Sequence, residues 1–256
     1  MDRLLLASDQ DGVVLSFKVF RIPVEVRPSF LLIAVFLGFG TGRVDFVVAW
    51  VLVIFISILV HELGHALTAK SFGSEVAIQL NAIGGLTSWT IPDQEIGPGR
   101  RALVAASGSA VGLLFGGIVW LAALPFGPFT GLTRFVLTNL VFVNVFWGLL
   151  NWLPIRPLDG GHLLTSLLDK FAPERGERIA NAIFLATAAA ALAAAVVFQL
   201  LFVGLIAAWL LWEEINQGRP RRPPVPIPVM DFDSGIDEAG DPNDVIEAAE
   251  ENPPPP

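Results

Sequence analysis

Long apolar runs separated by short polar stretches dominate the chain from residue 28 to residue 212. The runs cover residues 28–40, 44–71, 102–124, 132–153 and 179–212. A single helix over the last run would be about 50 Å long, whereas the hydrocarbon core of a bilayer is roughly 30 Å thick. We therefore predict two helices there, turning near Gln199–Gly204, and six membrane spans in total.

Two other stretches have the alternating pattern and β-branched content that are typical of strands. Residues 12–27 predict a short strand or two near the membrane surface, and residues 74–91 predict strands around a break at Gly84-Gly85. The expected fold is an all-α polytopic membrane protein. It has about six transmembrane helices and a small membrane-associated β-sheet or hairpin.

Small and polar residues inside the spans predict how the helices pack. Gly108, Gly112 and Gly116 recur every four residues, a pattern that favours close helix packing. Asn144 and Asn151 lie seven residues apart, so both are expected to face the interior of the bundle. For Asn144 we predict a hydrogen bond to another helix.

Composition agrees with a membrane protein and separates the C-terminal tail from the rest. Charged residues make up 16% of the chain, whereas soluble domains contain about 25%. Nine of the 24 acidic residues lie from Gly218 onward. We predict a cytoplasmic N-terminal segment with short strands (1–28), a transmembrane core (29–217) and a disordered, Pro-rich acidic tail (218–256).

The distribution of basic residues predicts the orientation in the membrane. If the N-terminus is cytoplasmic and six spans alternate, only Arg43 and Arg134 of the 16 Lys and Arg residues fall outside the cytoplasm. The positive-inside rule predicts such a bias. We expect a multi-pass protein of the plasma membrane with both termini in the cytoplasm.

The sequence HELGH at residues 61–65 is the first sign of chemistry. The chain has no cysteine and three histidines, so a metal would have to be bound by His, Asp or Glu. His61 and His65 would share one helix face, and Glu62 could act as a general base, as in zinc proteases. The alternative is a polar helix end with a satisfied His–Glu pair. Ionisable groups at the end of a membrane span favour the metal site.

Catalytic zinc usually has three protein ligands, so a third must be found. Asp159 is the only carboxylate between Glu95 and Asp169, and it follows a span that is broken by Pro154 and Pro157. Such a break could turn the carboxylate back toward the histidines. The alternative is a Pro-Gly turn in which Asp159 caps a helix.

Three motifs together resemble the site-2 protease family of intramembrane zinc metalloproteases. They are HELGH at 61–65, a GG-containing hairpin at 81–87, and N-x-x-P-x-x-P-L-D-G-G at 151–161. The resemblance implies one zinc ion bound by His61, His65 and Asp159, with Glu62 as the catalytic acid and base. It also implies that Asn151 contacts the substrate. The chain departs from some relatives in lacking a PDZ-like insert and nucleotide-sensing domains.

The resemblance also implies a substrate, which we expect to be a single-span membrane protein. A membrane helix must unwind before it can be cut, and residues 76–90 could pair with it as an added strand. Gly84 and Gly85 would allow close backbone approach, although an ordinary hairpin turn also explains them. For His162, an interfacial position is favoured over a role in orienting a ligand. Lipid is an expected partner and nucleic acid is not.

Two other functions remain open on the sequence. A catalytically inactive membrane scaffold of the same fold is one, although all three predicted ligands and Glu62 are present. A different membrane-embedded zinc protease is the other, and it would be expected to use a downstream glutamate as its third ligand.

Overall fold

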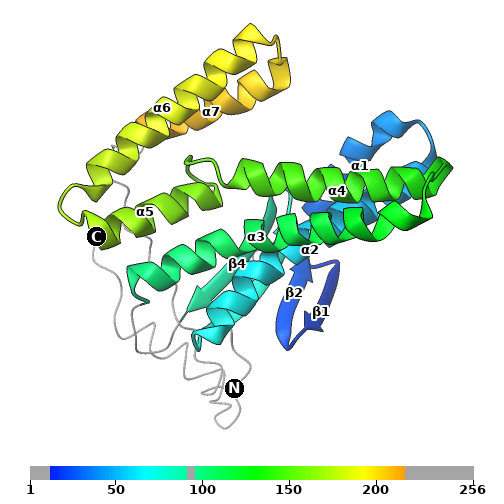
Figure 1. The fold of residues 1–256 in the computed structure, drawn as a ribbon, viewed down its shortest axis with the longest axis horizontal. Coiled ribbons are helices and arrows are strands. Elements are labelled where there is room, and N and C mark those ends of the chain that lie inside the picture. The colour runs from blue at the N-terminus through cyan, green and yellow to red at the C-terminus, as the bar shows by residue number, and fades with distance from the viewer. Residues whose placement is uncertain (1–11, 91–95, 217–256) are drawn as a thin grey trace, which may run out of the picture. The chain divides into compact units, whose positions relative to one another are not determined.

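A computed structural model of the protein describes residues 12–90 and 96–216, which are mostly helical (Figure 1). The predicted tail at 218–256 and the first residues of the N-terminal segment lie outside the described residues. The strands are β1 (Leu15–Val19), β2 (Ile22–Val26), β3 (Glu75–Asn81) and β4 (Gly84–Thr90). The helices are α1 (Pro28–Gly38), α2 (Val44–Ser71), α3 (Pro98–Ala123), α4 (Gly131–Asn151), α5 (Asp159–Phe171), α6 (Gly176–Val197) and α7 (Leu201–Asn216), with short 3-10 turns at Phe39–Thr41 and Leu124–Phe126.

Four described helices are long and apolar enough to cross a membrane. They are α2, α3 with its 3-10 extension to Phe126, α4 and α6. The apolar helix Pro28–Thr41 is shorter, and α7 has 16 residues. The predicted count of six spans is therefore not confirmed. The two helices predicted from the run 179–212 are present, and their turn lies slightly earlier than predicted, between Val197 and Leu201.

The sheet has the strand order β1-β2-β3-β4, with antiparallel pairs at both sides and a parallel β2–β3 pair in the centre. Its core residues are almost fully buried and pack against α1 and the C-terminal part of α2: Ile22, Val24, Val26, Ile78, Leu80, Phe30, Ala66 and Ala69. The turn between β3 and β4 lies at residues 82–83, so the expected break at Gly84-Gly85 is corrected. These two glycines begin β4.

Helices α2, α3 and α4 pack against one another, as Figure 1 shows. Gly108, Gly112 and Gly116 are all buried on α3, which agrees with the predicted packing role. A Cβ on Gly64 of α2 would lie 2.7 Å from the carbonyl oxygen of Ser107, so the two backbones are in direct contact there. This close approach brings the HELGH turn of α2 against α3.

Candidate metal centre

The first part of the site is one turn near the C-terminal end of α2. His61 and His65 are 5% and 7% exposed, and their ring centroids lie 4.9 Å apart. The i, i+4 spacing on a continuous helix stacks the two side chains on one face. Nε2 of His65 lies 3.2 Å from Nε2 of His61, so the two nitrogens point to the same place.

The second part is Asp159, the first residue of α5. Its Oδ2 lies 3.1 Å from Nε2 of His61 and 3.2 Å from Nε2 of His65. The three donor atoms form a nearly equilateral triangle. Donors that bind zinc tetrahedrally at about 2.0–2.1 Å are about 3.3 Å from one another. The donor set therefore fits zinc in both chemistry and spacing.

Close packing between the end of α4 and the start of α5 positions Asp159. A Cβ on Gly160 would collide with the carbonyl oxygens of Trp152 and Leu153, and one on Gly161 would lie 2.8 Å from the carbonyl oxygen of Ile155. Glycine at these positions allows the chain to fold back at the end of α4. Asp159 consequently points toward α2 and not into the loop.

Neighbouring groups orient two of the three candidate ligands. Nδ1 of His65 lies 2.6 Å from the carbonyl oxygen of Val104, to which it donates a hydrogen bond when Nε2 is free to bind metal. The Ser109 hydroxyl donates to Oδ2 of Asp159 at 3.2 Å. Gly108 lies directly over His65, where a Cβ would collide with Nε2.

Electrostatics favour an ionised Asp159. Burial raises the pKa of this carboxyl, but hydrogen bonds with His61 and His65 and the charge on the imidazoles outweigh burial. Its pKa therefore lies well below the ordinary value. The ionised carboxylate is the form that binds a metal ion.

Glu62 lies beside the donor set but makes a different contact. Its side chain is 6% exposed, and its Oε2 accepts a hydrogen bond of 2.6 Å from the hydroxyl of Thr87 on β4. A Cβ on Gly85 would collide with the Glu62 carboxyl group. Glycine at position 85 therefore leaves the space that Glu62 occupies.

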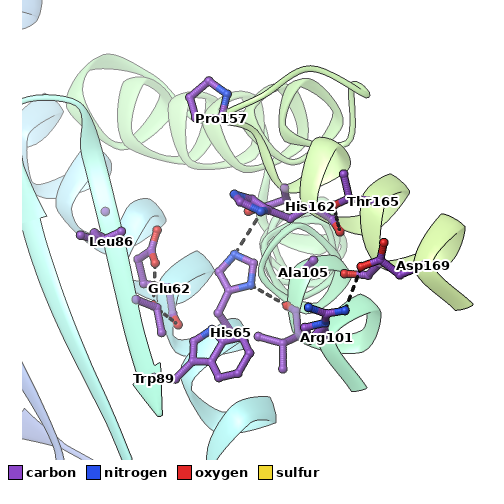
Figure 2. Close-up of a pocket in the computed structure, with 15 residues that line it drawn as sticks. Glu62, His65, Leu86, Trp89, Arg101, Ala105, Pro157, His162, Thr165 and Asp169 are labelled. Atoms are coloured by element: carbon purple, nitrogen blue, oxygen red, sulfur yellow. Dashed lines mark hydrogen bonds and ion pairs between the residues drawn. The ribbon is translucent and has the colours of Figure 1, made fainter. Parts of the chain in front are cut away.

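A cavity of about 450 Å³ opens in front of these residues. Figure 2 shows Leu86 and Trp89 of β4 on one side of it, and His162 and Asp169 of α5 on the other. Glu62, His65 and Asp159 also line it. At its outer end Arg101 forms an ion pair of 2.8 Å with Asp169. The cavity therefore gives a ligand access to both the candidate metal ligands and the candidate base.

The residues predicted from the sequence are placed as follows. His61, His65 and Asp159 converge, and they form a group that could hold a metal ion. Gly85 and His162 line the cavity, whereas Asn151 is buried at the end of α4 and is not among the lining residues. The roles of Gly84, Gly85 and Asn151 toward a substrate remain predictions.

Sequence reasoning missed the residues that hold the site in place. Thr87 lies two residues after Gly85, so both project from the same side of β4. Ser109 directly follows Gly108 in the small-residue pattern of α3. The strand alternation could have suggested Thr87. Nothing in the local sequence links Ser109 to Asp159.

Comparison with known proteins gives consistent matches. The sequence profile described as Peptidase family M50 matches residues 128–191, which include Asp159. A zinc metalloprotease of Methanocaldococcus jannaschii is 29% identical over 60% of this chain and 45% of its own length. A candidate zinc metalloprotease of Synechocystis is 34% identical over 59% of this chain and 42% of its own length. The chain thus spans less than half the length of these two relatives.

A solved structure supports the fold. The site-2 protease from Methanocaldococcus jannaschii superposes with a TM-score of 0.56 at 22% identity. The match covers 81% of this chain and 97% of that structure. Together the matches confirm the resemblance that the three sequence motifs indicated.

Proposed function

We propose that this chain, which is related to Peptidase family M50 and shares the fold of a site-2 protease, is a membrane zinc metalloendopeptidase. Its substrates would be single-span membrane proteins, which it would cut within or near their transmembrane segments. One observation carries the proposal. Three metal-binding donor atoms converge within 3.2 Å of one another beside Glu62, at a cavity large enough for an extended peptide.

The chemistry follows from the positions of the side chains. One zinc ion bound by His61, His65 and Asp159 would supply Lewis acidity toward a carbonyl and lower the pKa of water. The Glu62 carboxylate accepts the proton from the attacking water and later returns it to the leaving amine. The Thr87 hydroxyl fixes one oxygen of Glu62, which leaves the other free for the proton.

Strand β4 is the proposed substrate platform. It is the last strand in the order β1-β2-β3-β4, and its residues line the cavity beside Glu62. An unwound substrate could pair with this strand and so satisfy backbone groups that lipid cannot satisfy. Gly84 and Gly85 would permit close approach of the substrate backbone, in addition to the space that Gly85 leaves for Glu62.

The proposed setting is the plasma membrane, with both termini in the cytoplasm. In that orientation the C-terminal end of α2, which carries His61 and His65, faces the cytoplasm. Water would then reach the cavity from the cytosol. The distribution of Lys and Arg in the sequence supports this orientation.

The substitution Glu62→Gln tests the proposed catalytic role. We expect the variant to bind zinc normally and to lose cleavage by at least about 100-fold, because the amide cannot accept the proton. Cleavage is measured on co-expressed single-span reporter proteins, and zinc on the purified full chain. The matched control is Glu75→Gln on exposed β3, which makes the same chemical change outside the cavity. Wild-type cleavage by Glu62→Gln would remove Glu62 from the mechanism.

A further inference from the structure

The two candidate histidine ligands differ in how their second ring nitrogen is held. Nδ1 of His65 has the carbonyl oxygen of Val104 at 2.6 Å. Among the described residues, no hydrogen bond is seen to Nδ1 of His61, although this side chain is equally buried. A histidine that binds metal through Nε2 carries its proton on Nδ1, and that N–H usually donates to a fixed acceptor. His61 therefore requires an acceptor that the residues discussed so far do not supply.

Asn144 on α4 has the complementary deficiency. It is 3% exposed, and its Nδ2 donates to the hydroxyl of Ser57 and to the carbonyl oxygen of Leu140, both at 2.8 Å. Its Oδ1 is buried and has no hydrogen-bond partner within the described part of the chain. An unsatisfied buried acceptor is costly, by about 1–3 kcal/mol, and so calls for an explanation.

The donor and the acceptor border the same small space. A Cβ on Gly112 of α3 would lie 3.7 Å from Oδ1 of Asn144 and 4.0 Å from Nδ1 of His61. Ser57, which holds the other end of the Asn144 amide, lies one helical turn before His61 on α2. The amide is thus anchored from the same helix as the histidine, and its free oxygen is directed into the space beside that ring.

We propose that Asn144 is a positioning residue for His61. Its Oδ1 accepts the Nδ1 proton of His61, directly or through one water molecule, and so fixes the tautomer in which Nε2 is free to bind metal. The inference rests on the proposed function only in taking His61 as a zinc ligand. It gives each histidine its own acceptor, the Val104 carbonyl on α3 for His65 and the Asn144 amide on α4 for His61.

Three variants of the full-length chain separate this role from helix packing. Asn144→Leu removes the acceptor at similar volume. Asn144→Asp keeps an acceptor but loses the N–H donors that hold Ser57 and Leu140. Ser57→Ala removes the anchor and leaves the acceptor intact. If Asn144 only joined α2 to α4, all three variants would behave alike, because each removes the hydrogen bond between the helices.

The readouts are the zinc dissociation constant, from competition with a chelator, and the visible spectrum of the Co²⁺-substituted protein. We expect Asn144→Leu to weaken zinc binding by about 10–100-fold and to shift the Co²⁺ bands. Asn144→Asp and Ser57→Ala should stay within about threefold of wild type. An equal loss in Asn144→Leu and Asn144→Asp would overturn the proposal, as would unchanged zinc binding and an unchanged spectrum in Asn144→Leu.

Folding is checked by thermal melting in detergent. If Asn144→Leu does not fold, the Asn144→Asp variant decides: near-normal zinc binding supports the acceptor role, and a loss beyond tenfold contradicts it. Absence of zinc binding in the wild-type protein would instead be a failure of the proposed function. The two failures are therefore distinguishable.

Discussion

The candidate metal centre is assembled from two pieces of chain that are positioned in different ways. The α2 piece carries His61, Glu62 and His65 on a single helical turn, so their relation to one another is set by helix geometry. The α5 piece carries Asp159, whose position depends on backbone contacts at the end of α4 and on Ser109 of α3. The first piece is local and robust, whereas the second depends on tertiary packing.

This difference predicts where the site is most easily lost. A change in the α2 turn removes a ligand but leaves the remaining geometry in place. A change in the packing around Asp159 moves an intact ligand away from the other two. Substitutions outside the ligand set should therefore affect metal binding most when they lie around the start of α5.

Gly160→Ala is expected to have the largest effect of this kind. The new Cβ would collide with the carbonyl oxygens of Trp152 and Leu153, and backbone atoms cannot move aside as a flexible side chain can. We expect the free energy of unfolding to fall by about 1–3 kcal/mol, and zinc binding to be lost because Asp159 is displaced. Melting temperature and zinc content of the purified protein are the measurements.

The matched control is Gly117→Ala on α3, where an added Cβ meets no atom within 4 Å. This variant should bind zinc normally and melt at or slightly above the wild-type temperature, since alanine favours a helix. Normal zinc content in Gly160→Ala would show that the start of α5 adjusts freely, and the contrast between the two pieces would be wrong.

Ser109→Ala should have an intermediate effect. It removes the hydroxyl that donates to Oδ2 of Asp159 but leaves the backbone around Gly160 unchanged. A hydrogen bond to a charged group contributes about 1.5–3 kcal/mol, so we expect zinc to bind about tenfold or more weakly. The Ser107→Ala variant, which loses only hydrogen bonds to the carbonyls of Gly64 and Val104, is the control on the same helix. Equal zinc affinity in the two variants would argue against a role for Ser109 in holding Asp159.

Arg101→Gln should have the smallest effect. The ion pair between Arg101 and Asp169 joins α3 to the other end of α5, but its side chains are 43% and 50% exposed. Exposed pairs contribute about 0–1 kcal/mol. We expect a melting temperature within a few degrees of wild type and unchanged zinc affinity. A large loss of zinc would mean that this ion pair, and not the glycine packing, holds α5 in place.

The sequence predicted the α2 piece and the identity of the third ligand for physical reasons that are local. Two histidines four residues apart must share a helix face, and Asp159 was the only carboxylate in a stretch of more than seventy residues. What surrounds them was not predicted. The hydroxyls of Thr87 and Ser109 reach Glu62 and Asp159 only through tertiary contacts, which a single sequence does not specify.

The fold was predicted to a similar depth. Apolar runs located the long helices, but α5 was not predicted as a separate element, because its 13 residues form an amphipathic helix between two proline-containing loops. The parallel pairing of β2 with β3 was also missed, since α1 and α2 lie between these strands in the chain. The turn at residues 82–83 shows that adjacent glycines can begin a strand as well as form a turn. Here a neighbouring side chain, Glu62, requires one of them.

The most direct test of the account is the zinc content of the purified full chain beside that of the Asp159→Ala variant. The account predicts one zinc per chain in the wild type and little or none in the variant, because two histidines alone bind the ion weakly. The control variant Asp169→Ala, which changes a carboxylate on the same helix at the far end of the cavity, should keep its zinc. Full zinc occupancy in Asp159→Ala would contradict the account and would require a different third ligand.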